Sequence, residues 1–207
     1  MKTKSARLLA CLLLPSLITV TLSAAENEKT VLSAGAAAGS LETRIGDADL
    51  AGGTGTVQLH LGELMLFDAS LRGSYTYLKS TDSTNIERQY ADIDLIFSAS
   101  ALGICTPYGM VGARYDKFDA LAYSGNADDQ TGLGLGAGVE IAVLPGLLSI
   151  TPYGRYVTAE KLETLTYGLD AQLHFTVLSA GLNVTYEDNL SREGNLTTVT
   201  AYVGLRF

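Results

Sequence analysis

Residues 132–143 read Gly-Leu-Gly-Leu-Gly-Ala-Gly-Val-Glu-Ile-Ala-Val, and this stretch decides the fold class. Every second residue from Leu133 to Val143 is apolar, whereas the residues between them, up to Glu140, are glycine or charged. Successive side chains of a β-strand point to opposite faces, so the segment would have one apolar face and one small or polar face. It predicts a strand that separates an apolar environment from a polar one.

The same alternation continues along the rest of the chain. In residues 164–175, Leu165, Tyr167 and Leu169 alternate with Thr166 and Gly168. Segments rich in Asp, Asn, Ser, Thr and Gly lie between the alternating stretches and are typical of loops and turns. Ten strands are predicted, at 30–40, 54–63, 68–78, 89–98, 105–116, 131–143, 149–158, 163–175, 178–187 and 197–207. Eight or twelve strands remain open, because the first segment is weakly patterned.

The composition excludes several classes of protein. The chain has 207 residues, of which 47% are hydrophobic and 17% charged, and its net charge is −8. It is too apolar and too weakly charged for an intrinsically disordered protein. A net negative charge repels phosphate, so we expect no nucleic-acid partner. Two cysteines exclude a disulfide scaffold, and the length suits one domain.

The first 25 residues resemble a secretory signal peptide. Lys2, Lys4 and Arg7 form a basic start, residues 8–22 form a short apolar run, and small residues precede a cleavage site after Ala25. A lipoprotein box at 8–11 and an uncleaved membrane anchor are the alternatives. Cleavage removes three basic residues and no acid, so the net charge falls from −8 to −11 and Cys105 is the only cysteine left.

The predicted domain, residues 26–207, is therefore exported and apolar, yet no later apolar run is long enough for a transmembrane helix. This combination favours a transmembrane antiparallel up-and-down β-barrel, with apolar faces toward lipid and polar faces inside. A soluble sandwich is the alternative, since it could leave mid-strand charges such as Arg72 and Glu140 on its surface. Short turns near 63–67, 99–104, 144–148 and 175–177 alternate with longer loops near 41–53, 79–88, 117–130, 159–162 and 188–196, as in outer-membrane barrels.

Two segments resemble a known family. Residues 106–115, Thr-Pro-Tyr-Gly-Met-Val-Gly-Ala-Arg-Tyr, are similar to a strand of the small outer-membrane barrels of the opacity-protein and outer-membrane-protein-A type. The chain ends Ala-Tyr-Val-Gly-Leu-Arg-Phe, which resembles the signal read by the outer-membrane assembly machinery, with Tyr202 and Phe207 in that signal. The resemblance implies the outer membrane of a Gram-negative-type cell as the location, and outer-membrane lipids and the assembly machinery as partners of a monomer.

The predicted inward faces carry charges of both signs. Opposite charges that are removed from bulk water need partners, so we expect an ion-pair network in the lumen. The predicted members are Arg72, Asp92, Asp94, Arg114, Glu140, Arg155, Asp170 and Arg206. Such a network either fills the lumen or leaves a narrow polar path. Gly132, Gly134, Gly136 and Gly138 also point inward and leave room for large neighbours or for water.

Catalysis is not expected, and neither a cofactor nor a metal site is predicted. The two histidines, His60 and His174, would lie in the lumen at the periplasmic ends of their strands, the wrong end for a site that opens outward. Asp170 is the best acidic partner for His174, but four residues of a strand span roughly 13 Å. Cys105 would face lipid. The acids of 116–130 lack a Ca²⁺-loop spacing, and this segment is an expected solvated loop whose Phe118, Leu121 and Tyr123 could form an adhesive surface.

Outward tyrosines near the long loops are expected to form an aromatic girdle at the membrane interface. They are Tyr75, Tyr77, Tyr115, Tyr156, Tyr167 and Tyr186. The sequence thus predicts a small outer-membrane barrel with a structural or surface-interaction role and a largely filled polar lumen. A narrow channel for small solutes or ions is the alternative, and a barrel enzyme that acts on lipid or peptide is a further one.

Overall fold

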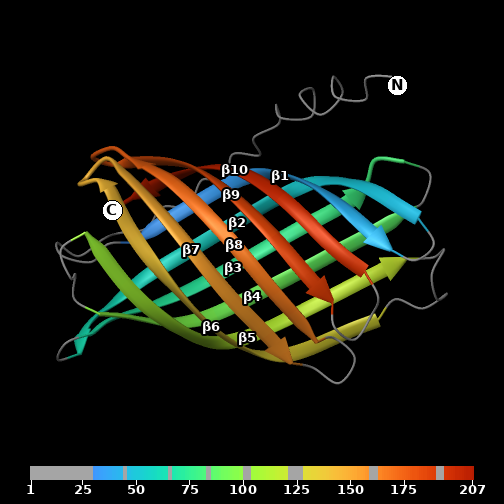
Figure 1. Cartoon of the computed structure of the whole chain (residues 1–207), viewed down its shortest axis with the longest axis horizontal. Helices are drawn as coiled ribbons and strands as arrows, with labels where there is room; N and C mark the ends of the chain where they lie inside the picture. The colour runs from blue at the N-terminus through green and yellow to red at the C-terminus, as the bar shows by residue number, and fades with distance from the viewer. Residues whose placement is uncertain are drawn as a thin grey trace.

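The structure is a computed structural model that describes residues 30–43, 46–64, 67–82, 85–99, 104–120, 128–158, 163–189 and 194–207. The predicted signal peptide and residues Leu121 and Tyr123 lie outside these ranges. The described residues form ten strands (Figure 1). They are β1 (Val31–Thr43), β2 (Gly46–Leu64), β3 (Phe67–Ser80), β4 (Ile86–Ala99), β5 (Cys105–Ala120), β6 (Asp128–Leu144), β7 (Leu148–Thr158), β8 (Thr164–His174), β9 (Leu178–Asn189) and β10 (Gly194–Arg206).

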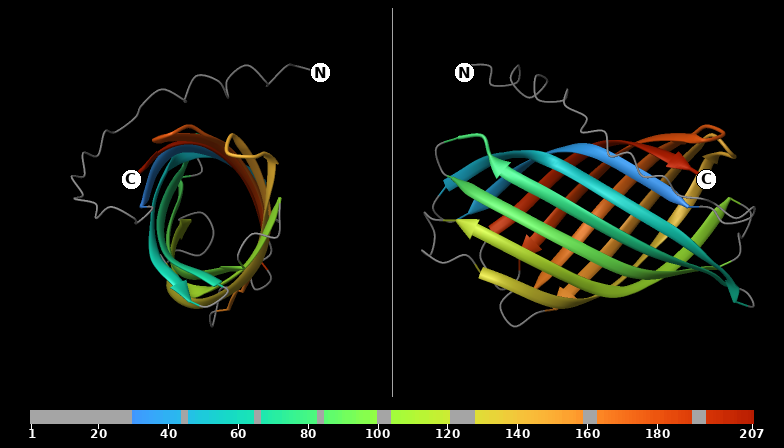
Figure 2. Two further views of the ribbon diagram at one scale, coloured as in Figure 1. Left: turned by 90° about the vertical axis from the view of Figure 1, so that its left-hand side faces the viewer. Right: turned by 180° about the vertical axis from the view of Figure 1, so that it is seen from behind.

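These strands form one closed antiparallel barrel in which each strand pairs with its neighbours in sequence. β1 closes the sheet against β10, in a register that runs from Val31 opposite Arg206 to Thr43 opposite Gly194. Figure 2 shows the closed wall end-on and from behind. Closure satisfies the backbone groups that a free strand edge would expose, which is required of a sheet surrounded by lipid. The predicted ten-stranded barrel is confirmed.

Both kinds of connection are present, at opposite ends of the barrel. At the end that we call the short-turn end, β6 and β7 are joined by residues 145–147, with Leu147 N donating to Leu144 O at 2.9 Å and Gly146 at φ 74°. The first and last described residues also lie at this end, where Thr30 N donates to Phe207 O at 3.1 Å. The opposite end, which carries the connections after β1, β3, β5, β7 and β9, is the loop end.

The strands extend further toward the loop end than the sequence predicts. β2 begins at Gly46 and β5 continues to Ala120, so much of the predicted loops 41–53, 79–88, 117–130 and 188–196 is paired strand. Asp116 and Phe118 are therefore not loop residues: both lie in β5 and point inward, opposite Tyr90 and Arg88 of β4. The expectation of a solvated adhesive loop is wrong for these two residues. Alternation continues through them, but acidic residues in strands near a rim are locally indistinguishable from loop composition.

The outer wall is apolar along most of its length. Large hydrophobic side chains are exposed on every strand from β2 to β10 except β7, including Ile93, Leu133, Leu169 and Val203. The register places the six predicted girdle tyrosines on this outer face, and Tyr167 lies opposite Tyr186 across β8 and β9. None of the described residues forms a helix that could span a membrane.

The inner face near the loop end holds a small apolar core. Side chains of β1, β2, β3, β4 and β10 pack together there, against Tyr90 and Phe118. The buried members are Ala37, Leu41, Ala48, Leu50, Leu78, Ile86 and Leu196. A barrel of this size can be filled by its own side chains. This cluster, which we call the loop-end core, lies on one side of the lumen.

Candidate functional site

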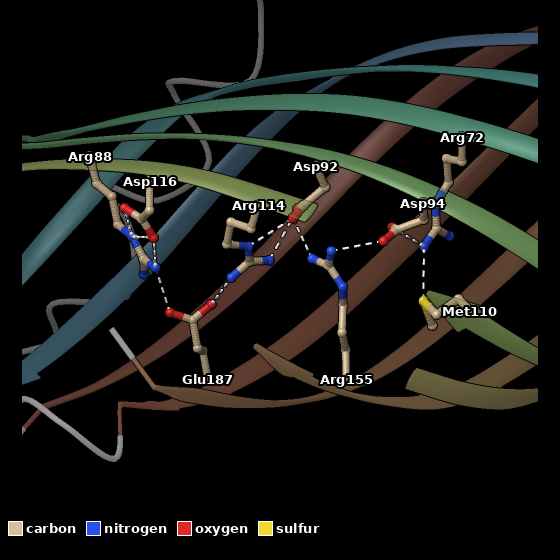
Figure 3. Close-up of polar contacts among 9 residues, drawn as sticks. All are labelled: Arg72, Arg88, Asp92, Asp94, Met110, Arg114, Asp116, Arg155 and Glu187. Carbon is tan, nitrogen blue, oxygen red and sulfur yellow. Dashed lines mark hydrogen bonds and ion pairs between the residues drawn. The ribbon is translucent and has the colours of Figure 1, made fainter. Parts of the chain in front are cut away.

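The lumen contains a continuous chain of alternating charges beside the loop-end core. Eight side chains are linked in the order Arg72, Asp94, Arg155, Asp92, Arg114, Glu187, Arg88 and Asp116 (Figure 3). Four of them are arginines and four are acids, so the chain is electrically neutral. We call it the charge chain.

Strand register explains one part of the charge chain. Asp94 lies opposite Arg72 on β3, and Asp92 lies opposite Arg114 on β5. Arg114 Nε is 2.8 Å from Asp92 Oδ1, and Arg72 Nη2 is 3.1 Å from Asp94 Oδ2. Because directly opposed residues of one face are within reach of each other, these contacts follow from local pairing.

The remaining links cross the lumen. Arg155 of β7 contacts both Asp92 and Asp94 of β4, with Nη2 2.8 Å from Asp94 Oδ1. Glu187 of β9 accepts from Arg114 Nη1 at 2.9 Å and lies 2.6 Å from Arg88 Nη2. β4 and β9 are far apart around the ring of ten strands, so these side chains span the interior. The charge chain therefore crosses the lumen beside the loop-end core.

All members of the charge chain except Arg72 are buried. Buried charges are stable only when paired and hydrogen-bonded, and the chain satisfies this through arginines that each contact one or two carboxylates. Tyr90 adds a further contact, because its ring lies 5.2 Å from the guanidinium carbon of Arg88 and 4.8 Å from that of Arg114. These distances suit cation–π interaction and join the charge chain to the loop-end core.

The structure brings together five of the eight residues predicted for a lumen network: Arg72, Asp92, Asp94, Arg114 and Arg155. Glu140, Asp170 and Arg206 also point inward, but within the described ranges none of them joins an ion pair. The sequence analysis missed Arg88, Asp116 and Glu187. Glu187 had the correct inward parity in its strand, whereas Arg88 and Asp116 fell at or beside predicted loops.

Glycines on the inner face of β6 make room for large neighbours. A Cβ on Gly134 would lie 2.9 Å from Arg155 Nη2, and one on Gly136 would lie 2.9 Å from the terminal methyl of Met110. Met110 in turn lies 3.4 Å from Arg72 Nη2. Side chains of β7 and β5 therefore cover Gly134 and Gly136. At these two positions the missing side chains leave room for large neighbours.

Nearer the short-turn end, His174 contacts a serine and an arginine. Ser149 Oγ is 2.8 Å from His174 Nε2, and Arg206 Nη1 is 3.2 Å from Nδ1. An arginine can only donate, so Nδ1 accepts and the imidazole proton lies on Nε2, which donates to Ser149. A nucleophilic serine needs the reverse arrangement, in which the histidine accepts its proton. This geometry does not activate Ser149.

His60 also points inward, opposite Ser70, and a bulge follows it at Gly62, where φ is 120°. Cys105 is a free cysteine on the outer face of β5, opposite Ile141. Among the described residues, no three side chains of the His, Cys, Asp or Glu type gather as metal ligands would.

The two residues predicted for an assembly signal have different surroundings in the structure. Phe207 is exposed, and its backbone N–H donates to Thr30 O at 2.9 Å. Tyr202 points into the lumen, where its hydroxyl donates to Asp170.

Comparison with known proteins identifies the fold. No family model matches the chain, and no curated protein matches it. Among solved structures, an outer membrane channel from Pseudomonas putida F1 is similar, with a TM-score of 0.55 and 10% identity over 89% of this chain and 97% of the channel. The translocator domain of the autotransporter NalP from Neisseria meningitidis has a TM-score of 0.50 and 14% identity over 89% of this chain and 90% of that domain.

The fold is that of the outer-membrane β-barrels. Neisserial surface protein A is a further neighbour, with a TM-score of 0.42 and 17% identity over 88% of this chain and the whole of the other. The alternative of a soluble sandwich is excluded, because the sheet is a single closed barrel with an apolar outside and a charged inside. This wall and this fold are those of a transmembrane β-barrel.

Proposed function

We propose that this barrel is a closed outer-membrane protein with a structural or surface-interaction role and without catalytic activity. The observation that supports it is the charge chain, which crosses the lumen beside the loop-end core. A pore needs a continuous polar path, whereas here six ion pairs join buried side chains, a seventh joins Asp94 to the partly exposed Arg72, and a cluster of packed apolar residues lies beside them. The tautomer at His174 argues against a serine hydrolase.

The orientation follows from the two ends. The short-turn end, which carries the C-terminus, faces the periplasm, and the loop end faces outward, as in outer-membrane barrels generally. The partners on this proposal are outer-membrane lipids along the apolar wall and the assembly machinery at the exposed Phe207. A monomer is sufficient, because the sheet closes on itself and leaves no strand edge for another copy.

A narrow channel is the second candidate, and one observation favours it. Glu140 points into the lumen and is exposed to solvent, so water enters from the short-turn end. Conduction through the whole barrel would still require the charge chain to separate, which would leave several arginines and carboxylates buried without partners.

Conductance of the refolded mature chain in a planar bilayer tests the proposal. Folding is verified first by the shift of the unboiled protein on a denaturing gel. We expect the folded wild-type barrel to give no current steps. The Arg114→Ala/Glu187→Ala double variant, which opens the centre of the charge chain, should give current steps. Glu140→Ala, at a position outside the charge chain, is the matched control and should give no current steps. Discrete steps in the wild-type protein, with an ion preference changed by Arg114→Ala, would favour the channel.

A further inference from the structure

The half of the lumen between the charge chain and the short-turn end is open to solvent. Glu140 lies opposite Thr106 on the inner face and is nevertheless exposed. Arg72 is the member of the charge chain at its end nearer the short turns. Its side chain is 29% exposed, whereas that of its partner Asp94 is 2% exposed. Solvent therefore reaches the Arg72–Asp94 pair and stops there. We call this blind half of the lumen the vestibule.

Three tyrosine rings line the vestibule, and each lies on a glycine of a neighbouring strand. A Cβ on Gly168 would lie 2.1 Å from Cζ of Tyr153, and one on Gly181 would lie 2.3 Å from Cζ of Tyr202. Tyr108 covers Gly138 in the same way, with its Cζ 2.6 Å from the position of the missing Cβ. The rings thus occupy the space that side chains would fill and lie against the wall, with their other sides toward the lumen.

Asp170 lies among these rings, and in the described part of the chain it joins no ion pair. Its two carboxylate oxygens accept from Tyr202 Oη at 3.0 and 2.8 Å. The carboxylate also interacts with the side chain of Asn183 and electrostatically with all three tyrosines, with Glu140 and with Arg72, whose own ion pair is with Asp94. In the described part of the chain, no lysine or arginine forms an ion pair with Asp170 or Glu140. The vestibule therefore carries two carboxylates that no ion pair neutralises.

Neighbouring cations are already engaged. The four arginines of the charge chain are matched by its four acids, so the chain supplies no spare positive charge. Arg206, near the mouth, donates to the neutral ring of His174. A carboxylate that is confined in a narrow lumen favours a counter-ion, and aromatic faces attract an ammonium group through their quadrupole.

We propose that the vestibule binds a small organic cation with a quaternary or primary ammonium group. Asp170 is its counter-ion, and Tyr108, Tyr153 and Tyr202 provide the aromatic faces. An anion would be repelled by Asp170 and Glu140, and a neutral sugar would leave their charge unbalanced. This site goes beyond the proposed function: the ligand enters and leaves through the short-turn end, so no conduction through the charge chain is needed.

Choline and its neutral isostere 3,3-dimethyl-1-butanol are the probes that test this site. The chain has eleven tyrosines and no tryptophan, so tyrosine fluorescence of the refolded mature barrel, to which the three rings contribute, is not masked by tryptophan. A polyoxyethylene alkyl ether detergent is used, because phosphocholine detergents would compete. The variants are Asp170→Asn, which keeps an acceptor for Tyr202, and Tyr153→Leu. Asp188→Asn, on the outer face of β9, is the matched control.

We expect a saturable change with choline and none with the isostere. Binding should weaken roughly tenfold in Asp170→Asn and by a smaller factor in Tyr153→Leu, while Asp188→Asn binds as the wild type does. If Asp170→Asn does not refold, Glu140→Gln, at an exposed position, gives the second comparison and should also weaken binding. Absence of saturable binding, equal responses to choline and the isostere, or wild-type affinity in the refolded carboxylate variants would overturn the proposal. A silent barrel that ignores choline would overturn this inference alone and leave the proposed function standing.

Discussion

Arg114 and Glu187 join strands on different sides of the barrel: Nη1 of Arg114 on β5 lies 2.9 Å from Oε2 of Glu187 on β9, although 73 residues separate them in the chain. Glu187 also contacts Arg88, and Arg114 also contacts Asp92, so this pair joins the two halves of the charge chain. Since all four side chains are buried, the chain acts as an internal brace across the lumen.

Glu187→Gln should destabilise the barrel substantially. The substitution removes the carboxylate that faces two buried arginines, and loss of one partner from a buried ion pair typically costs about 3–5 kcal/mol. The measurement is urea unfolding of the barrel in lipid vesicles, followed by the gel shift. Asp188→Asn, the next residue and on the outer face, should leave the midpoint nearly unchanged. Equal midpoints for the two variants would show that the charge chain contributes little.

Gly168→Ala should destabilise the barrel because its new methyl group would occupy the place of the Tyr153 ring. The ring would have to leave the wall, where its hydroxyl bonds Asn183 at 3.3 Å, and overpacking of this kind costs about 1–3 kcal/mol. Unfolding in urea measures the effect. The cost should largely disappear in a Tyr153→Ala background, because neighbouring sites are non-additive. Gly73→Ala, where nothing lies within 4 Å of the added carbon, is the control; a similar loss there would count against the role of the ring.

Leu169→Arg should destabilise the barrel in lipid. Leu169 is 48% exposed in the middle of β8 and faces outward, so an arginine there would face hydrocarbon. Such substitutions cost about 2–4 kcal/mol at the bilayer midplane and about 0–1 near the interfaces. Thr131→Arg, exposed near the loop end of β6, should therefore be tolerated. Unfolding in vesicles compares the two variants, and an equal effect would contradict the assigned position of the wall in the membrane.

The imidazole of His174 should carry its proton on Nε2. Long-range ¹H–¹⁵N correlation spectra of the ¹⁵N-labelled barrel distinguish the two ring nitrogens. Arg206→Ala removes the donor to Nδ1 and should allow the other tautomer to appear, whereas Ser149→Ala should leave the proton on Nε2. A wild-type ring protonated on Nδ1 would reopen the case for a serine that is activated by His174.

The wall of the barrel could be predicted from sequence because period-two alternation is a local property. Residues 132–143 display it so clearly that the apolar face of β6, and with it the transmembrane barrel, followed without any knowledge of partners. The same parity placed Arg72, Asp94 and Arg155 inside. The extent of the strands could not be predicted equally well: Arg88 and Asp116 lie near the loop end, where polar residues occur both in strands and in loops.

The contacts inside the lumen were decided only by the tertiary structure. Sequence parity placed Asp170 and Arg206 inside just as it placed Asp92 and Arg114. In the structure, however, Asp170 accepts from a tyrosine hydroxyl and Arg206 donates to a histidine ring. Which inward residues meet depends on the stagger between strands and on closure of β1 against β10, which sets the height of each side chain along the axis. Alternation along one strand contains no information about that stagger. The sequence by itself therefore determined which residues face lipid and which face the lumen, and the closed barrel alone decided that Glu187 would meet Arg114.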